Sequence, residues 1–228
     1  MRILLRASRC DRMASAFRRP RVVLIVVAFC LSVVACDEAG SPVAERSRSS
    51  HPAESAPRTQ PIRQTDDAGR RLPFTTRFPN RWSANNDGTR YEPCTAVTNS
   101  ELLSFELDPN SVRDVAAADH QTARGCRWSY QADRLTSLAQ YLGNLEGSGA
   151  TDLASYKHVN SNWHWLADES IDGRTVAIET IGRDECSTYL ISGRAVVVTA
   201  VALRNSESGV VCERALAFTR ATIGRIPR

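Results

Sequence analysis

Short motifs that mark common enzyme classes are missing from this sequence. It has no GxSxG nucleophile turn, no HExxH zinc motif, no P-loop and no GxGxxG placed after a strand. Histidine is scarce: of four in 228 residues, the three that follow residue 100 (His120, His158 and His164) occur singly. A metal or general-base role for any of them needs partners that the sequence does not place. We therefore expect a protein that is not an enzyme, with no catalytic residues, no metal and no cofactor.

Lysine is nearly absent as well. Lys157 is the only lysine, and every other basic residue is arginine. The formal net charge of +4 is concentrated at the N-terminus, because residues 1–36 hold seven arginines and one aspartate. The remainder has 22 basic against 24 acidic residues. Since the main part of the chain is slightly acidic, we expect no nucleic-acid partner.

No apolar run is long enough to span a membrane as a helix. The longest, residues 22–34, has about 13 residues, whereas a spanning helix needs roughly 20. Arg18, Arg19 and Arg21 precede this run, and small residues follow it. Residues 1–36 therefore predict an export signal. Met13 is an alternative start, because the residues before it add nothing that such a signal needs.

A cysteine directly follows the small residues, which is typical of a bacterial lipobox. In lipoproteins with this motif the cysteine is acylated and becomes the first residue, and two or three acyl chains anchor a protein stably. We expect Cys36 to be lipidated and the protein to be held at the extracytoplasmic face of the cell membrane. The alternative is an ordinary cleaved signal, or an uncleaved anchor, in which Cys36 is incidental.

Large apolar residues are almost absent between residues 37 and 71, where Ser, Pro, Arg, Gln and Ala dominate. Such a segment buries too little surface to offset its ordering entropy. We predict a disordered tether over residues 37–71 and a single folded domain over residues 72–228, a length suited to one core.

Four cysteines fall in this domain: Cys94, Cys126, Cys186 and Cys212. An even number in an exported domain indicates disulfides, and four cysteines allow three connectivities. Sequence order favours Cys94–Cys126 and Cys186–Cys212. A zinc site is the rival, but no CxxC or HxxxH spacing supports it.

Hydrophobic periodicity in the domain predicts the element order α-β-β-α-β-β-β-β-α. Asp172-Gly173 is a strong hairpin signal between strands predicted at residues 165–171 and 174–181. Residues 195–203 are apolar on both faces and predict a central strand. Residues 209–222 predict a closing helix. The fold class is therefore α+β, a largely antiparallel sheet packed by helices.

Several short segments occur in this sequence together with the lipobox and the tether. They are Glu92-Pro93-Cys94 before a helix, Gly125-Cys126-Arg127-Trp128, Ile171-Asp172-Gly173-Arg174 and Cys212-Glu213-Arg214-Ala215. Over about residues 91–227 this set resembles an actinobacterial lipoprotein family of unknown function, DUF3558. The resemblance implies an exported, disulfide-bearing, lipid-anchored domain and carries over no catalytic residues. A PsbP-like α/β/α arrangement, as in some other mycobacterial lipoproteins, is a further analogy.

The most noticeable aromatic cluster is Trp163-His164-Trp165, which could line a ligand groove by stacking against a sugar or a lipid headgroup. The competing interpretation is that strand alternation buries the two tryptophans and leaves His164 in water. We expect a non-enzymatic lipoprotein that binds a ligand or a partner, such as another envelope or secretion-system protein. The alternative is a small envelope hydrolase or ligand carrier with a groove near Trp163 to Trp165.

Overall fold

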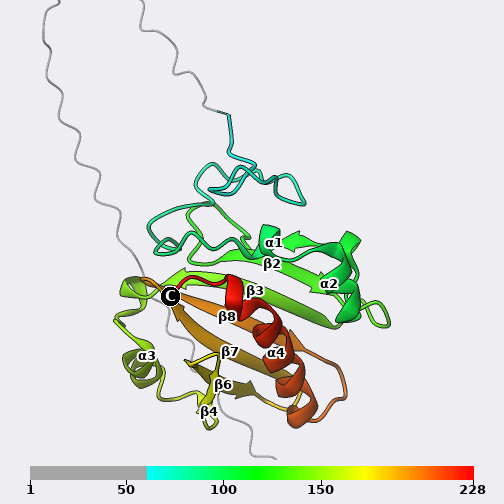
Figure 1. Cartoon of the computed structure of the whole chain (residues 1–228), viewed down its shortest axis with the longest axis vertical. Helices are drawn as coiled ribbons and strands as arrows, with labels where there is room; N and C mark the ends of the chain where they lie inside the picture. The colour runs from blue at the N-terminus through cyan, green and yellow to red at the C-terminus, as the bar shows by residue number, and fades with distance from the viewer. Residues whose placement is uncertain (1–60) are drawn as a thin grey trace, which may run out of the picture. The chain divides into compact units, whose positions relative to one another are not determined.

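The computed structural model describes residues 61–228 (Figure 1). Its strands are β1 (Arg113–Asp114), β2 (Arg124–Ser129), β3 (Ser137–Asn144), β4 (His164–Trp165), β5 (Glu169–Ile171), β6 (Arg174–Ile181), β7 (Glu185–Ser192) and β8 (Ala195–Ala202). Its α-helices are α1 (Pro93–Ala96), α2 (Asn99–Ser104), α3 (Leu153–Val159) and α4 (Ser208–Thr222). The predicted signal peptide, Cys36 and most of the predicted tether lie outside these residues. Within them, no helix combines the length and the apolar character that a membrane crossing requires.

The strands form one sheet in the order β1-β2-β3-β8-β7-β6-β4, with β5 also paired to β6. Every pairing is antiparallel. β8 lies in the middle, between β3 and β7, as its apolar character on both faces predicts. The predicted α+β class is therefore confirmed.

The strand predicted at residues 165–171 is divided in two. Trp165 pairs with Glu179, but Glu169 pairs with Val176, so one extra residue is accommodated between β4 and β5. An extra residue on one strand interrupts the ladder in the manner of a β-bulge. The hairpin that follows is the predicted one, because Asp172 and Gly173 both adopt positive φ between β5 and β6.

One face of the sheet is covered by α4, which crosses β7 and β8 in Figure 1. From β8, Val197 and Val201 point into this core, together with Phe218 of α4. A disulfide joins Cys186 of β7 to Cys212 of α4, with 5.0 Å between their Cα atoms. The helix is therefore attached to the sheet both by apolar packing and by a covalent bond.

A second disulfide joins Cys94 of α1 to Cys126 of β2. These are the two pairs that sequence order favours. Beside Cys126, Gly125 passes so close to β3 that a Cβ there would lie 2.2 Å from the carbonyl oxygen of Gln140. Only glycine fits this position, which accounts for the first residue of the Gly125-Cys126-Arg127-Trp128 segment.

The folded domain begins earlier than predicted. The sequence predicts a disordered tether as far as residue 71, but residues 61–71 are packed onto the domain. The Asp66 side chain is 4% exposed and accepts hydrogen bonds from the backbone N–H groups of Ala68 and Arg70 and from the Thr95 hydroxyl. The side-chain amide of Gln64 donates to the carbonyl oxygen of Thr76 and accepts from the backbone N–H of the same residue. Polar side chains order this segment where apolar burial is missing, so composition alone gave the wrong boundary.

A buried ion network connects this N-terminal part to the sheet. The carboxylate of Glu92 accepts hydrogen bonds from Arg81 at 2.9 and 3.3 Å and from Arg124 at 2.9 Å. Arg81 also donates to Asp114 at 2.8 Å. Arg81 is 0% exposed and Glu92 is 2% exposed, so these charges are removed from water and compensate one another.

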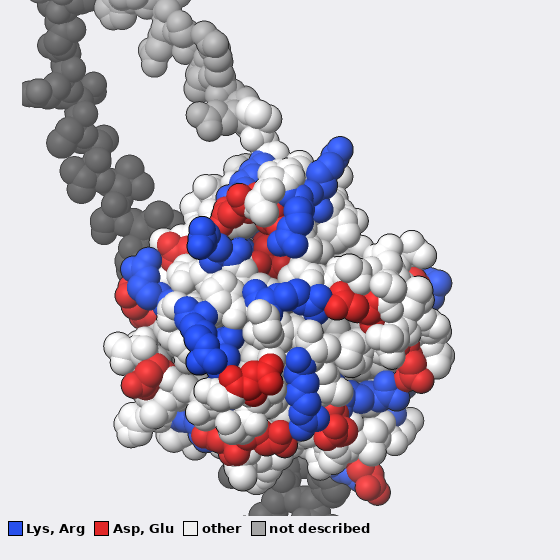
Figure 2. All heavy atoms as spheres, viewed as in Figure 1, with Lys and Arg blue, Asp and Glu red and all other residues white. Residues whose placement is uncertain are grey.

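The face of the domain that carries α4 shows basic and acidic side chains interleaved (Figure 2). Arg214 and Arg220 of α4 pair with Glu106 and Glu213 at 2.7 and 3.0 Å. Since these charges are paired locally, this face presents no broad field of one sign.

Candidate functional site

The sheet face opposite α4 carries a cluster of aromatic rings. Trp163, Trp165, Tyr156 of α3 and Tyr189 of β7 pack with ring centroids 5.1–6.5 Å apart. We call these four residues the aromatic cluster. Both tryptophans are half-buried, whereas His164 between them is exposed. At the predicted ligand groove, Trp163, His164 and Trp165, the two tryptophan rings therefore pack on each other and on the two tyrosines.

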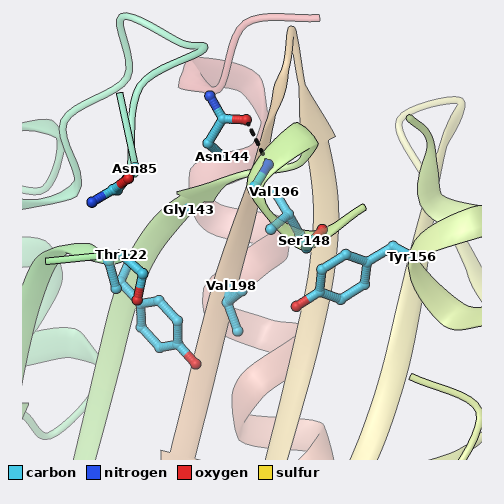
Figure 3. Close-up of a pocket in the computed structure, with 11 residues that line it drawn as sticks. Asn85, Thr122, Gly143, Asn144, Ser148, Tyr156, Val196 and Val198 are labelled. Carbon is cyan, nitrogen blue, oxygen red and sulfur yellow. Dashed lines mark hydrogen bonds between the residues drawn. The ribbon is translucent and has the colours of Figure 1, made fainter. Parts of the chain in front are cut away.

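An open pocket lies beside the aromatic cluster and shares Tyr156 with it. Its volume is about 370 Å³. Its walls come from β3, β8, α3 and three loops: Asn85, Thr122, Ala123, Tyr141, Gly143, Asn144, Gly147, Ser148, Tyr156, Val196 and Val198. We call it the tyrosine pocket. Figure 3 shows Tyr156 reaching from α3 toward Val198 on β8.

Two phenol groups give the pocket its hydrogen-bonding capacity. Among residues 61–228, the hydroxyls of Tyr141 and Tyr156 have no hydrogen-bond partner in the protein. Burial, followed by the nearby Tyr141 and Glu179, raises the pKa of Tyr156 to about 12. Burial also raises the pKa of Tyr141. Both hydroxyls are therefore protonated at neutral pH and free to donate to and accept from a ligand.

The rim of the pocket is held by internal hydrogen bonds. Asn144 donates to Asp87 at 2.6 Å, and its side-chain oxygen accepts from the backbone N–H of Glu146. The same oxygen accepts from the backbone N–H of Gly147, which is the dashed line in Figure 3. The Ser148 hydroxyl donates to the carbonyl oxygen of Leu145 at 2.6 Å. Because these hydrogen bonds already order the rim, ligand binding there loses little further conformational entropy.

A buried carboxyl lies behind the aromatic cluster. Glu179 of β6 is 4% exposed, and the Tyr189 hydroxyl donates to it. Burial raises the pKa of Glu179, with the nearby Glu185 acting in the same direction. Glu179 does not line the tyrosine pocket. Its carboxyl accepts the hydrogen bond from Tyr189 and is not exposed in that pocket.

The side chains that line the tyrosine pocket are uncharged. No charged side chain and no histidine or cysteine lines it, and its valines provide an apolar floor. Nucleophilic catalysis needs an activated nucleophile with a base in hydrogen-bond reach, and the lining offers no such pair. The arrangement suits an uncharged molecule that has hydroxyl groups and an apolar face.

The structure also places the other residues singled out in the sequence. His120, His158 and His164 are all exposed, on separate elements. Among the described residues, no three His, Cys, Asp or Glu side chains group in a way that could hold a metal ion. No sequence signal predicts the tyrosine pocket, because Tyr141 and Tyr156 lie on different elements and meet only through the fold.

Comparison with protein families decides the membership of the chain. The model of a family described as "Protein of unknown function (DUF3558)" matches residues 31–225. The chain belongs to the DUF3558 family. The match includes every strand and α-helix of this DUF3558 domain, from α1 to α4. It confirms the resemblance carried by the cysteine and glycine segments.

Other comparisons add little to the description of the DUF3558 domain. No curated protein matches the chain. Among solved structures, the solution structure of cyanobacterial PsbP (CyanoP) from Synechocystis sp. PCC 6803 is similar at 12% identity and a TM-score of 0.31. The likeness covers 52% of this chain and 85% of that one. A TM-score this low carries no argument, so the PsbP-like arrangement stays a prediction.

Proposed function

We propose that this protein is a non-enzymatic binding module of the cell envelope, lipid-anchored through Cys36 at the extracytoplasmic face of the membrane. In this proposal the tyrosine pocket receives a small uncharged ligand. The observation that carries it is the pair of unpartnered hydroxyls of Tyr141 and Tyr156 over an apolar floor, inside a rim that is already ordered. The pocket volume, about 370 Å³, falls within the range of small-molecule sites.

The two disulfides and the leader favour the envelope location. Disulfides persist in oxidising compartments outside the cytoplasm, and this domain has its four cysteines in two disulfide pairs. The leader has the basic, apolar and small-residue regions of an export signal, and Cys36 follows it directly. An envelope or secretion-system protein is a second kind of partner in this proposal, and nucleic acid is not.

The alternative proposal, a small envelope hydrolase or carrier with a groove near Trp163 to Trp165, has weaker support. The two tryptophan rings are 5.6 Å apart and pack on Tyr156 and Tyr189, which leaves no space between them for a stacked ligand. A carrier function would use the tyrosine pocket instead.

Ligand retention tests the proposed pocket. We expect the intact protein, purified gently from its own membranes, to carry a small neutral molecule that native mass spectrometry detects. Tyr156→Phe and Tyr141→Phe each remove one hydroxyl without changing the ring. Each should weaken retention about 2- to 10-fold, since a neutral hydrogen bond contributes roughly 0.5–1.5 kcal/mol.

Tyr130→Phe is the matched control, because Tyr130 belongs to the core on the α4 side of the sheet. Its retention of the ligand should equal that of the unchanged protein. A co-purified molecule held equally by all three variants would place the binding site elsewhere. A cross-linked protein partner with no small molecule would favour a protein-binding module.

Acyl labelling tests the anchor. Cys36→Ala should abolish incorporation of a metabolic fatty-acid label and release the protein from the membrane fraction, because no other cysteine follows the apolar run with small residues before it. The intact mass of the unchanged protein should show cleavage before Cys36. Label that persists in Cys36→Ala would mean that the anchor lies at another residue.

A further inference from the structure

We propose that the domain also binds a phosphate-bearing anion, in a second cavity formed where the β7–β8 turn meets the C-terminal residues. The cavity has a volume of about 400 Å³. Three arginines line it, Arg90, Arg194 and Arg228, together with the backbone of Gly88 and Gly193. We call it the arginine cavity. It shares no residue with the tyrosine pocket, so the two proposals are independent.

The arginines of the cavity have most of their hydrogen-bonding capacity free. Within residues 61–228, Arg90 makes no ion pair, and Arg228 donates only to the carbonyl oxygen of Asp172. Arg194 approaches Glu146 at 3.7 Å, with both side chains more than 60% exposed. Exposed pairs of this kind contribute about 0–1 kcal/mol. An anion of suitable geometry can therefore compete for all three guanidinium groups.

A fourth arginine holds the C-terminal residues in place. Arg174 of β6 donates to the carbonyl oxygens of Ile223, Ile226 and Pro227 and to that of Ile191 at the end of β7. These hydrogen bonds hold residues 223–227 against the end of β7, which places Arg228 at the cavity. Burial lowers the pKa of Arg174, and the positive charge of Arg228 lowers it further. The guanidinium of Arg174 is bound only by carbonyl oxygens, and it adds to the positive potential of this corner.

The loop and the turn that carry the other arginines are locked together. The backbone N–H of Arg194 donates to the carbonyl oxygen of Gly88 at 3.0 Å. Both Gly88 and Gly193 have positive φ, and a Cβ on Gly193 would lie 2.5 Å from that same oxygen. Glycine at both positions permits the close approach. Arg90 and Arg194, distant in sequence, are thereby held at one cavity before any ligand arrives.

Phosphate is the anion that this arrangement suits. A guanidinium group offers a planar fork of donors that matches two phosphate oxygens, and its charge strengthens each hydrogen bond. The nearby carboxylates are those of Asp87, Glu146 and Asp172, and the three lining arginines together with Arg174 outnumber them. The phosphate could belong to a soluble phosphate ester or to the headgroup of an anionic phospholipid.

The test uses the full chain in micelles of an uncharged detergent, followed by NMR of the arginine side-chain N–H signals. Inorganic phosphate is titrated in one arm, and micelles containing increasing phosphatidylglycerol are used in the other. We expect saturable shifts in the unchanged protein. Arg228→Gln and Arg90→Gln should each weaken binding about 10-fold, the loss of one charge-assisted contact. Arg183→Gln, an exposed arginine at the opposite end of β7, is the matched control and should bind normally.

The two arms distinguish the sources. Saturation by inorganic phosphate supports the cavity as a site for soluble phosphate esters. Saturation by phosphatidylglycerol alone supports it as a site for a lipid headgroup. Absence of saturable binding in both arms, or equal weakening by Arg183→Gln, would overturn the proposal. None of these results depends on whether the tyrosine pocket binds its ligand.

Discussion

The substitution Glu92→Gln is expected to destabilise the domain by about 3–5 kcal/mol, the typical cost of breaking a buried ion pair from one side. The Glu92 carboxylate is the shared partner of Arg81 and Arg124. Without it, the two buried guanidinium groups keep the carboxylate of Asp114, the sulfur of Cys94 and two carbonyl oxygens as partners. Packing and side-chain volume change little in this substitution. The decrease in the free energy of unfolding therefore measures the contribution of the charge.

Urea denaturation followed by tryptophan fluorescence measures this loss. Glu106→Gln is the matched control, because it removes a carboxylate from the exposed pair with Arg214, where about 0–1 kcal/mol is expected. Similar small changes in both variants would show that the buried ion network contributes no more than a surface pair. The network would then serve to position the N-terminal segment without stabilising it.

The second large effect is expected from the disulfide between β7 and α4. The double variant Cys186→Ala, Cys212→Ala should lose about 3–4 kcal/mol, because the bond closes an interval of 26 residues in the unfolded chain. Both cysteines are buried, so alanine leaves a small apolar space and no unpaired polar group. The urea midpoint should fall, with the slope rising as the unfolded chain becomes more extended.

Peptide mapping without reduction is the companion measurement. It should recover Cys94 linked to Cys126, and Cys186 linked to Cys212, in the unchanged protein. In the double variant the Cys94–Cys126 peptide should persist. A crossed link such as Cys94–Cys186 in the unchanged protein would contradict both the pairing and the arrangement of α1 beside β2.

The elements that the sequence predicts well are those with a local physical cause. Thr98 and Glu101 have capping-box spacing and form that box at the start of α2. Asp172 and Gly173 form the predicted hairpin turn. The apolar run at residues 195–203 becomes the central strand β8, Ala195–Ala202. Each of these signals is complete within a few residues of sequence.

The features that escaped prediction depend on contacts between distant residues. Glu92 meets Arg124, 32 residues away, and nothing in either local sequence marks a buried charge. The N-terminal boundary was misplaced for a similar reason, since Asp66 is buried through hydrogen bonds that include one from Thr95, 29 residues away. Trp163 precedes β4, so strand alternation does not place it, and the rings that pack against both tryptophans, Tyr156 and Tyr189, come from other elements.

The outer strands of the sheet offer little backbone for a further strand to pair with. β1 and β4 are each two residues long and β5 is three, and the extra residue between β4 and β5 interrupts that margin, so the unpaired backbone N–H and C=O groups are discontinuous. A partner that docks by extending a sheet needs a longer free edge, and the same shortage discourages chains of this protein from stacking edge to edge when crowded on a surface. If the protein is the binding module proposed above, we therefore expect it to bind through side chains and cavities, and neighbouring copies to pack closely without polymerising through their strands.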